Sequence, residues 1–388
     1  MTEPLVTAEI DLSAIAHNTR EFARIAGPNV KIMPAVKADG YGHGAIEVSK
    51  TALENGASAL GVARVEEGVS LRQAGIDAPI LVFGYASPIN TMELIDYDLT
   101  ATVSNLDVAL AISDQAQDVG KKVKVHLKVD TGMGRIGVLT GEGHPGCHGD
   151  FRHSVDDVLV MAGMKGIELE GIYTHFASAD SHDKTYTIQQ LNLFTDFIDN
   201  LGKKGLDIPV KHAANSAAAI ELPQSHMDMI RPGISFYGLK PSDEVDMSLI
   251  DLKPAMQLKS RIISLKTVPS GFHVSYSSIH TTDRKTTIAV VPIGYADGFS
   301  RHFSSNGHML VHGTRAPIVG RVCMDLTMLD VGHIQGISLE DEVVVFGIQN
   351  GETLSVDELA GRIHTIHYEI IANLSPRVKR IYLFQDRA

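Results

Sequence analysis

Short apolar runs alternate with segments of helical periodicity through the first 240 or so residues of the chain. The apolar runs are predicted to be strands, and they cover residues 30–37, 57–63, 80–84, 100–103, 123–130, 169–175, 209–213 and 229–235. The segments between them have the spacing of amphipathic helices at 13–26, 45–55, 66–74, 106–119 and 187–201. Strand and helix in regular alternation predict a parallel sheet that is covered by helices.

The number of strands distinguishes two kinds of parallel sheet. Eight strand candidates within residues 1–240 favour an α/β fold of the TIM type, a (β/α)8 barrel. A doubly wound open sheet, which usually has about six strands, is the alternative.

The pattern changes after residue 240. Short strands separated by turns are predicted at 255–268, 286–292, 309–312, 316–319, 342–346 and 380–384, with helices only at 356–362 and 364–372. We therefore predict a mostly β C-terminal domain over residues 241–388. This prediction allows the first ten or so residues of the chain to pack on that domain.

Composition narrows the class of protein. The 388 residues are 44% hydrophobic and 21% charged, which is typical of a globular protein with a sizeable core. The formal net charge of −12 argues against nucleic acid as a partner, but it leaves room for a local site that binds a small anion. Cys147 and Cys323 form no disulfide framework. No signal peptide and no run of ~20 apolar residues is present, so we predict a soluble cytoplasmic protein with no membrane contact.

Polar side chains lie at the C-terminal ends of several predicted strands. Lys37 ends the first strand, His175 ends the sixth, Asn215 and Ser216 follow the seventh, and Arg231 lies at the eighth. Active sites of (β/α)8 barrels lie at this end of the strands, so we expect these residues to converge on one mouth.

The residues at this mouth point to one cofactor. A lysine that a buried strand delivers into the glycine-rich segment 38–44 is placed to form a Schiff base, although an ordinary lysine at a strand end is the alternative. Backbone amides at Gly233 and Ile234, together with the hydroxyls of Ser216 and Tyr41, would cradle a phosphate. A Schiff-base lysine and a phosphate cradle together suggest pyridoxal 5'-phosphate.

Six segments are similar to motifs of the alanine racemase family, in that family's order and across nearly the whole chain. They are residues 35–44 (AVKADGYGHG), 128–135 (KVDTGMGR), 214–216 (ANS), 231–234 (RPGI), 294–298 (GYADG) and 320–325 (GRVCMD). The resemblance implies a pyridoxal 5'-phosphate enzyme that interconverts L-alanine and D-alanine, supplying D-alanine for peptidoglycan. It also implies a head-to-tail homodimer whose active sites are shared across the interface.

The resemblance assigns a role to each matching residue. Lys37 and Tyr276 are implied as the two catalytic acid/bases, with Tyr276 reaching the site from the partner subunit. The implied cofactor contacts come from Lys37, Tyr41, Arg135, His175, Ser216, Arg231, Gly233, Ile234 and Tyr368, and the substrate contacts from Arg135 and Met324. Supporting roles fall to Lys128 (a candidate for carbamylation), Asn215 and Asp325, with His175 bonded to Tyr276 and Arg231. The implied entrance consists of Tyr295, Tyr368, Asp180, Arg301 and Arg321, and no metal is expected.

This assignment is chemically coherent. Inversion of a stereocentre removes the α-proton from one face and returns a proton to the other, so two bases on opposite faces suit it. Arg231 is always charged, and beside the cofactor's pyridine nitrogen it would keep that nitrogen unprotonated. We interpret this as a means of suppressing side reactions. The residues that follow Tyr276, Ser277 to His280, depart from the glycine and aromatic pattern of the family.

Two other motifs are weaker. Residues 132–137 match G-x-G-x-x-G after a predicted strand, but 138–149 has a loop pattern where a dinucleotide-binding fold requires a helix. His144, Cys147, His148 and His153 crowd one stretch, with a spacing that fits no standard zinc site and favours a solvated loop. Cys323 is interpreted as a packed thiol, since no base lies beside it in the sequence.

Three other functions remain as alternatives. A racemase of the same fold that acts on serine, lysine or a broader set differs only in pocket volume, where one methylene changes preference by ~1–3 kcal/mol. A fold-related amino-acid decarboxylase would place a glutamate where Arg231 stands. A non-catalytic carrier of the cofactor would have no use for a β domain that bears Tyr276.

Overall fold

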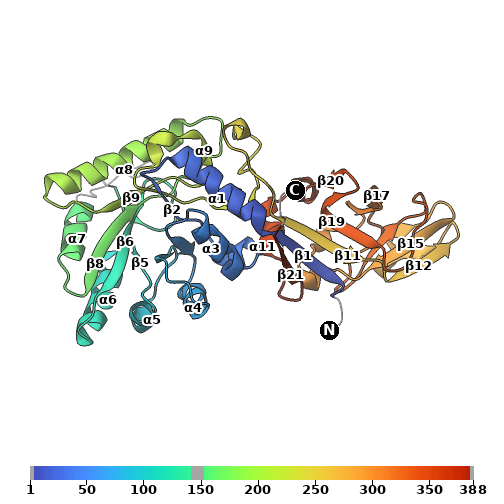
Figure 1. The fold of residues 1–388 in the computed structure, drawn as a ribbon, viewed down its shortest axis with the longest axis horizontal. Coiled ribbons are helices and arrows are strands. Elements are labelled where there is room, and N and C mark those ends of the chain that lie inside the picture. The colour runs from blue at the N-terminus through green and yellow to red at the C-terminus, as the bar shows by residue number, and fades with distance from the viewer. Residues whose placement is uncertain (1–3, 141–152, 385–388) are drawn as a thin grey trace. The chain divides into compact units, whose positions relative to one another are not determined.

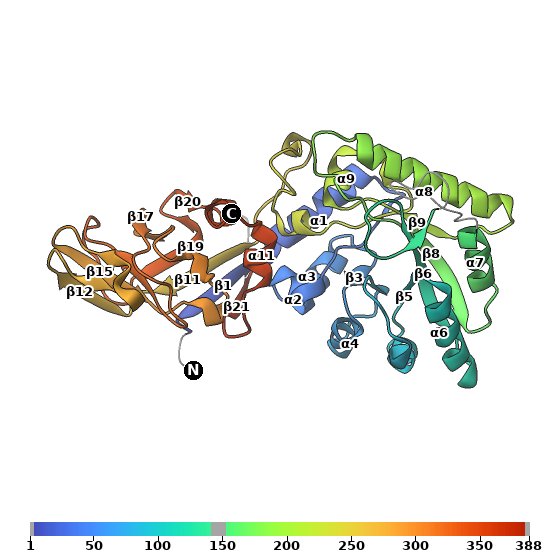
Figure 2. The same ribbon diagram turned by 180° about the vertical axis from the view of Figure 1, so that it is seen from behind.

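The computed structural model describes residues 4–140 and 153–384 of the chain. The chain forms two compact units, which we call the barrel unit and the β unit (Figures 1 and 2). The barrel unit comprises Ala14–Gly40 and Ala45–Pro254, and the β unit comprises Met1–Ser13, Tyr41–Gly44 and Ala255–Ala388. Both units therefore combine stretches that are separate in the sequence. The division of the chain at residue 240 stays a prediction.

Eight parallel strands among the described residues of the barrel unit form a closed ring. In order around the ring they are β2 (Lys31–Ile32), β3 (Leu60–Val62), β4 (Ile80–Val82), β5 (Ala101–Val103), β6 (Val123–Asp130), β8 (Ile167–Tyr173), β9 (Val210–His212) and β10 (Met229–Ile230). Most neighbours are joined by parallel ladders, and β10 pairs with β2. The parallel bridges Ala35–Gly61 and Leu81–Thr100, and a bond from the Arg231 amide to the chain after β9, complete the ring. The predicted (β/α)8 barrel is confirmed.

Helices cover the outside of this ring (Figure 1). They are α1 (Leu12–Ala26), α3 (Ala45–Glu54), α4 (Val65–Gln73), α5 (Thr91–Asp96), α6 (Leu106–Asp118), α7 (His153–Ala162), α8 (Thr185–Lys203) and α9 (Ser216–Glu221). Each helix buries one apolar face; α8, for example, buries Leu191, Phe194 and Phe197 at helical spacing. Asn105 caps α6, because its side chain accepts a hydrogen bond of 2.9 Å from the Val108 amide.

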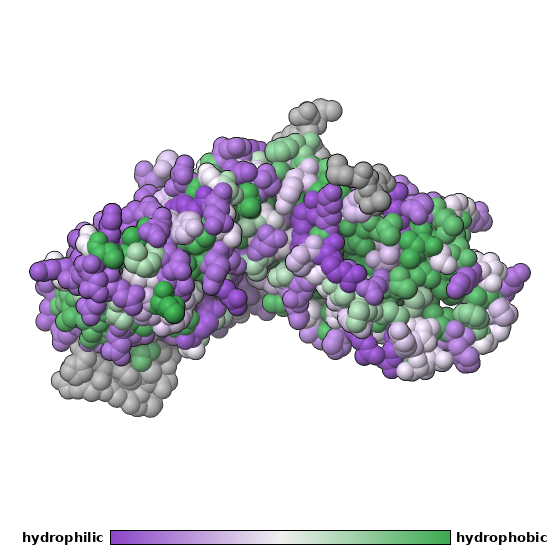
Figure 3. Space-filling model, turned by 90° about the horizontal axis from the view of Figure 1, so that it is seen from below, coloured by the Kyte–Doolittle hydropathy of each residue, from purple (hydrophilic) through white to green (hydrophobic). Residues whose placement is uncertain are grey.

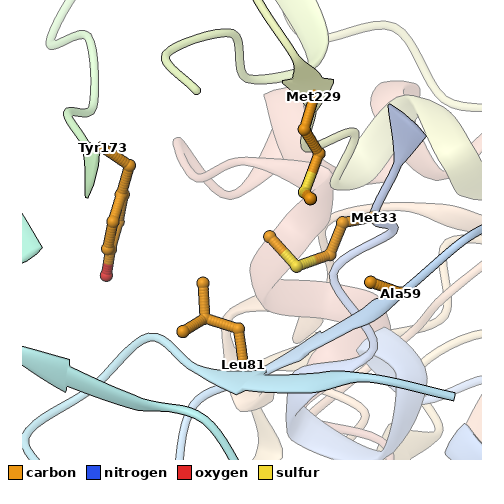
Figure 4. Packing of buried hydrophobic residues seen from close by; sticks show 5 residues of the cluster. All are labelled: Met33, Ala59, Leu81, Tyr173 and Met229. Carbon is orange, nitrogen blue, oxygen red and sulfur yellow. The ribbon is translucent and has the colours of Figure 1, made fainter. Parts of the chain in front are cut away.

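The inside of the ring is filled by side chains. Met33, Ala59, Leu81, Tyr173 and Met229 come from five different strand segments and pack together, each no more than 5% exposed. Figure 4 shows the two methionines and Leu81 pointing toward the same space as the Tyr173 ring. Such layers make the centre of a barrel a packed core, so the usable site lies at the strand ends.

The β unit is built around one large sheet. Its strands follow the order β17 (Thr314–Pro317), β16 (His308–Val311), β19 (Glu342–Gln349), β11 (Met256–Arg261), β1 (Val6–Asp11) and β21 (Lys379–Leu383), with β20 (Glu352–Leu354) paired to β19. A second sheet has the order β12 (Ser264–Val268), β15 (Thr286–Val291) and β18 (Thr327–Asp330). A short hairpin joins β13 (His273–Val274) to β14 (His280–Thr281). Helices α10 (Val356–Arg362) and α11 (His367–Ala372) complete the unit.

The start of the chain belongs to this unit. Strand β1 lies inside the large sheet, antiparallel to β11 and parallel to β21. Both of its neighbours come from the other end of the sequence, which is why local patterns did not predict β1 as a strand. The expectation that the first residues pack on the β domain agrees with this pairing.

The structure differs from the predicted elements at a few points. The apolar stretch 255–268 is two strands, β11 and β12, since the chain leaves the large sheet after Arg261 and enters the second sheet at Ser264. The predicted strand 229–235 ends at Ile230, and Ile234–Tyr237 forms a 3-10 helix, η3. The short helices α5 and α9 were not predicted because they span too few turns to show a periodicity. Helix α7, of ten residues, was not predicted either, and it begins at His153, which the sequence had placed in a loop.

A pair of glycines tests the packing between α6 and the start of β8. A Cβ atom on buried Gly166 would lie 2.1 Å from the Ser113 carbonyl oxygen, whereas one on exposed Gly163 would make only ordinary contacts of 3.6 Å. We expect Gly166→Ala to lower the free energy of unfolding by about 1–3 kcal/mol, as overpacking does. Gly163→Ala should leave it unchanged or raise it by less than about 1 kcal/mol. Urea denaturation of both variants measures the difference, and equal stabilities would contradict the packing described.

Candidate active site

Lys37 follows the first barrel strand and begins a turn of unusual backbone geometry. The three residues after it, Ala38, Asp39 and Gly40, all have φ between 52° and 62° and ψ between 44° and 51°, which is left-handed helical geometry. Such geometry is unfavourable for residues other than glycine, so the surroundings must hold it. The Lys37 side chain is half-buried. Burial and the Arg135 charge lower the pKa of its amine, while the charge of Glu67 acts to raise it.

Lys128 lies near the end of β6, with its Nζ 5.0 Å from the centre of the Tyr173 ring. It is 4% exposed. Burial, together with the charges of Arg135 and Arg231, lowers the pKa of its amine to about 7. Lys128 is therefore a lysine that is largely uncharged at mildly alkaline pH.

The loop after β6 is held by one carboxylate. Asp130 accepts hydrogen bonds from the amides of Gly132 (2.9 Å), Gly134 (3.1 Å) and Arg135 (2.9 Å). Burial acts to raise the pKa of Asp130, but these backbone donors outweigh it and the pKa is lowered. The ionised carboxylate thus fixes the loop, and the Arg135 side chain at its end is exposed.

Arg231 follows β10 and is 5% exposed. Its guanidinium donates to Nδ1 of His212 (3.0 Å) and to the carbonyls of Thr174 (2.7 Å) and Ala213 (3.0 Å). It also lies over the Tyr173 ring, 5.2 Å from the centre. Burial lowers its pKa to about 10, so Arg231 keeps its charge at neutral pH. Three neutral acceptors hold this buried cation at the ends of neighbouring strands.

Two buried histidines extend this network. Nδ1 of His126 lies 2.8 Å from Nε2 of His212. An arginine only donates, so Nδ1 of His212 accepts from Arg231 and its proton sits on Nε2, which donates to His126. Burial and the Arg231 charge lower the pKa of His126 to about 4 and that of His212 well below its usual value. Both rings are therefore neutral, with defined tautomers.

His175 lies two residues beyond β8. Burial lowers its pKa well below the usual value, and the charges of Arg231, Lys128, Arg135 and Lys37 act in the same direction. These four cations and His175 thus share one electrostatic environment at the C-terminal ends of the strands. In the described structure His212, and not His175, is the histidine that bonds the Arg231 guanidinium.

The ends of β9 and β10 meet at Ser216. Its hydroxyl oxygen accepts from the amides of Gly233 (2.8 Å) and Ser235 (3.4 Å). Asn215 precedes it as the cap of α9 and accepts from the Ala218 amide at 3.1 Å. Ser216, Gly233 and Ile234, which were expected to form a phosphate cradle, are thus brought together by the fold.

Helix α8 supplies a residue that sequence reasoning missed. Gln190 is fully buried; its side-chain oxygen accepts from the Ala177 amide (2.9 Å), and its amide nitrogen lies 3.4 Å from both Thr131 Oγ1 and the His175 carbonyl. Tyr186, one turn earlier, donates to the Gly132 carbonyl at 2.8 Å. These side chains join the loop that carries Arg135 to the loop that carries His175.

Other missed residues had a signal in the sequence. His126 is two residues before Lys128 on β6, so strand alternation places both side chains on the same face. No comparable local signal identifies His212 or Gln190, because their partners come from distant strands and loops.

The β unit holds most of the remaining predicted site residues. The ring centres of Tyr41 and Tyr368 lie 6.3 Å apart, and burial raises the pKa of Tyr41 to about 12. A Cβ on Gly42 would lie 2.1 Å from the Ile371 carbonyl, and one on Gly44 would lie 1.8 Å from the Tyr382 hydroxyl. The glycines of the segment 41–44 therefore permit its close packing within this unit.

Tyr276 lies between β13 and β14 and is 70% exposed. The residues on both sides, Ser275 and Ser277, have φ of 65° and 61°. Ser275 is held by its hydroxyl, which donates to the Arg321 carbonyl at 2.8 Å and lies 3.6 Å from the Cys323 sulfur. Cys323 is thus a packed neighbour of the Tyr276 turn, as the sequence indicated.

Tyr295 and Met324 lie in two loops that are bonded to each other. The Tyr295 amide donates to the Cys323 carbonyl (3.1 Å), and the next amide donates to the Met324 carbonyl (2.9 Å). Both side chains are exposed, at 44% and 52%. Arg321 and Asp325 flank them, and Asp325 pairs with Arg377 at 2.8 Å. Tyr276, Tyr295 and Met324 thus belong to one cluster of loops in the β unit.

Two further residues were predicted at the entrance, one in each unit. Arg301 is exposed at the start of the 3-10 helix η7 (Arg301–Phe303) in the β unit. Asp180 lies in the barrel unit, where its carbonyl accepts from the Ser242 hydroxyl at 2.6 Å. Their role at an entrance stays a prediction.

The weaker motifs acquire no site. Strand β7 (Val138–Leu139) follows the glycines 132–137 directly, so no helix begins there as a dinucleotide fold requires. Of the proposed zinc residues, His144, Cys147 and His148 lie outside the described residues. Within residues 4–140 and 153–384, no group of His, Cys, Asp and Glu is arranged to hold a metal ion. None of the described helices is long and apolar enough to cross a bilayer.

Taken together, a (β/α)8 barrel with lysines, arginines and neutral histidines at its strand ends, and a β domain that carries exposed tyrosines, define a protein of the barrel-plus-β class. Residues 10–241 match the family described as "Alanine racemase, N-terminal domain", and residues 255–382 match "Alanine racemase, C-terminal domain". The chain belongs to the alanine racemase family.

Individual relatives support this membership. The chain is 49% identical to "Alanine racemase" of Desulfosudis oleivorans over 375 residues, covering 97% of this chain and 96% of the relative. It is 47% identical to "Alanine racemase" of Methanococcus maripaludis over 378 residues, covering 97% and 98%. Among solved structures, the alanine racemase of Clostridium difficile 630 superposes with a TM-score of 0.92 at 38% identity, covering 99% of this chain and 97% of that one.

The neutral histidine pair makes stability depend on pH. An unfolded histidine titrates near 6.5 and His126 in the folded chain near 4. Between these values the unfolded chain binds a proton that the folded chain does not, so the free energy of unfolding falls as the pH drops from 6.5 toward 4. The fall is up to about 1.4 kcal/mol per pH unit for each such group.

The variant His126→Asn tests this linkage. Asparagine keeps an oxygen that accepts from His212 Nε2 and removes one titrating group, so we expect a shallower loss of stability between pH 6.5 and 4 than in the wild type. Urea denaturation at several pH values gives the slope of the free energy of unfolding against pH. The smaller asparagine side chain lowers this free energy by the same amount at every pH, so it does not change the slope. Identical slopes would contradict a neutral His126.

Proposed function

We propose that this chain interconverts L-alanine and D-alanine with pyridoxal 5'-phosphate as its cofactor, and that it supplies D-alanine for peptidoglycan. The observation that carries the proposal is the cluster of Lys37, Lys128, Arg135, His175 and Arg231 at the strand ends of the barrel, where the pKa values of Lys37, Lys128 and His175 are lowered by burial and by charges of other members. The names of the relatives support the same reaction. One structural neighbour, the alanine racemase of Bacillus anthracis, is described with bound L-Ala-P, at a TM-score of 0.91 and 36% identity.

The described residues fit the proposed cofactor. The lowered pKa of Lys37 favours the neutral amine that binds an aldehyde carbon covalently. Ser216, Gly233 and Ile234 bring a hydroxyl and backbone amides together for the phosphate, and Tyr41 and Tyr368 are proposed to add their hydroxyls. Arg231 presents a fixed cation for the pyridine nitrogen. When bound, the cofactor would supply an electron sink for the charge left at the α-carbon.

We propose that Lys37 and Tyr276 move the α-proton on opposite faces of the substrate. Lys37 holds or takes a proton at Nζ, and its lowered pKa favours the neutral amine that can take the proton. Tyr276 is proposed to act in the site of the partner subunit, a role that its 70% exposure in the single chain supports. One base on each face allows the proton to leave from one side and return from the other.

The substrate carboxylate is proposed to bind Arg135 and the backbone of Met324. Asp130 orders the backbone that carries Arg135, which reduces the entropy lost when the guanidinium binds an anion. Lys128 is proposed to orient Arg135 as a carbamate. Arg231 only donates hydrogen bonds, so it would leave the pyridine nitrogen unprotonated and limit side reactions.

We propose a homodimer whose subunits complete each other's sites. The β unit exposes large apolar side chains, among them Phe272, Ile279, Met324, Leu326 and Ile366. Figure 3 shows apolar residues gathered on one face of this unit, at the right-hand end of the view. An exposed apolar surface of this kind is typical of an interface. Tyr295, Tyr368, Asp180, Arg301 and Arg321 are proposed to line the entrance, where tyrosine bulk favours a small substrate such as alanine over larger amino acids.

The reaction is tested with the cofactor-loaded protein and L-alanine in D2O. We expect optical rotation to decay to zero while deuterium enters the α-position and no CO2 is released. Lys37→Ala should abolish exchange, and Tyr276→Phe should lower kcat by at least ~100-fold, as loss of a general acid/base does. Lys50→Ala, on the surface of α3, should leave the rate unchanged.

Other outcomes point to other functions. Release of CO2 would indicate a decarboxylase, and no change in the substrate would indicate a carrier. Parallel reactions with L-serine and L-lysine separate an alanine enzyme from a broader racemase. Faster turnover of either than of alanine would contradict the proposed substrate.

Lys128 gives a further test. A neutral amine adds CO2 to form a carbamate and releases one proton, and the pKa of about 7 leaves much of Lys128 neutral at pH 8. We expect a carbamate resonance in the 13C NMR spectrum of protein equilibrated with 13C-bicarbonate, lost in Lys128→Ala. Lys124 on the same strand is paired with Asp98, which raises its pKa, so Lys124→Ala should retain the resonance. A spectrum without the resonance would contradict carbamylation.

A further inference from the structure

The backbone after Lys37 requires a restraint. Ala38 and Asp39 are not glycines, yet both adopt left-handed geometry, which costs roughly 1–2 kcal/mol for each such residue. The direction in which Lys37 leaves the barrel strand depends on this turn, because the turn begins at its own carbonyl. Strained backbone of this kind persists only where surrounding groups fix it.

Glu67 supplies a bond to the turn. One oxygen of its carboxylate, Oε1, accepts from the Ala38 amide at 2.7 Å. The other, Oε2, accepts from the amides of Ala63 (2.6 Å) and Arg64 (3.1 Å). Glu67 lies in the first turn of α4, which directly follows strand β3. A single carboxylate therefore ties the residue after Lys37 to the end of the neighbouring strand.

Two further bonds stabilise the turn, but neither reaches Ala38. The Gly40 amide donates to the Val36 carbonyl at 2.9 Å, and Asp39 accepts from the Ala45 amide at 2.9 Å. Both act within the segment itself. Glu67 is the contact that links the turn to another strand of the barrel.

The position of Glu67 also gives it an electrostatic role. Burial and the Arg135 charge lower the pKa of Lys37, and Glu67 is the anion that opposes them. Lys128 and His175 also sense the charge of Lys37, and the second anion of this cluster, Asp130, acts on Lys128. Removal of the Glu67 charge would therefore move the pKa of Lys37 further down.

From these contacts we propose that Glu67 is a positioning residue for Lys37: it holds the left-handed turn that aims the amine, and its negative charge offsets that of Arg135 at the amine. This inference deepens the proposed function and rests on it where Lys37 acts as a base. Glu67 acts through Lys37 and touches no substrate. Misplacement of a catalytic group by about 1 Å costs on the order of 100-fold in rate, so a restraint on this turn bears directly on catalysis.

The primary test measures Lys37 without any reaction. Trace labelling of the cofactor-free protein with acetic anhydride, followed by mass spectrometry of the Lys37 peptide, gives its labelling rate as a function of pH. We expect the pKa of Lys37 to fall by at least about half a unit in Glu67→Gln, since one unit corresponds to 1.36 kcal/mol of interaction. Glu66→Gln, an exposed neighbour on the same helix, should leave the labelling curve unchanged.

A second readout separates positioning from a loss of structure. In the cofactor-loaded protein we expect Glu67→Gln to lower kcat about 10- to 100-fold with little change in KM, and Glu67→Asp, which keeps the charge, to recover part of the loss. The kinetic isotope effect on kcat is measured with α-deuterated L-alanine and with α-deuterated D-alanine. We expect it to rise only for the enantiomer from which Lys37 removes the α-proton. Circular dichroism and melting curves identify variants that have unfolded.

The outcomes are distinguishable. If Glu67→Gln remains folded and its labelling curve matches that of Glu66→Gln, the proposal for Glu67 is overturned, whatever the activity. If the pKa of Lys37 moves as expected but the wild type exchanges no α-deuterium, the proposed function fails and the contact between Glu67 and Lys37 stands.

Discussion

The arrangement of the barrel mouth depends on one buried cation. Arg231 cannot lose its proton at neutral pH, so the groups around it must accept hydrogen bonds or stay neutral. This requirement sets the tautomer of His212 and, through it, that of His126. The same charge contributes to the lowered pKa values of His175 and Lys128. Burial is the main cause of these lowered pKa values, and the fixed charge of Arg231 adds to it, so nitrogen groups that would be partly or fully charged in water are held toward their neutral forms.

A second constraint is mechanical. The loops that carry Lys37, Arg135 and His175 are held by side chains from helices on the outside of the barrel, namely Glu67 on α4 and Gln190 on α8. Loops at strand ends are free to vary, and this freedom lets one barrel support many reactions. Here, hydrogen bonds with these side chains restrict that freedom at the three places where the proposed chemistry needs fixed geometry. The helices therefore both cover the ring and set the position of the site.

Much of the fold could be predicted from the sequence because its signals are local. The eight strand runs and the longer helices were recognised by period and length, and β6 was predicted with the bounds the structure shows. Short helices such as α5 and α9 could not be recognised, since a few residues define no period. Strand β1 could not be recognised as a strand of a particular sheet, because both strands that pair with it lie more than 240 residues away.

The sequence by itself determined the family and the identity of the chemical groups, because lysine, arginine and tyrosine in fixed motifs limit the reactions that a site supports. Tertiary structure decided their state. Lys128 has a lowered pKa because the barrel buries it and the charges of Arg135 and Arg231 act on it, and Arg231 is bonded to His212 because β9 and β10 are neighbours in the ring. Burial and charge at a distance are properties of the assembled ring, so no local pattern could reveal them.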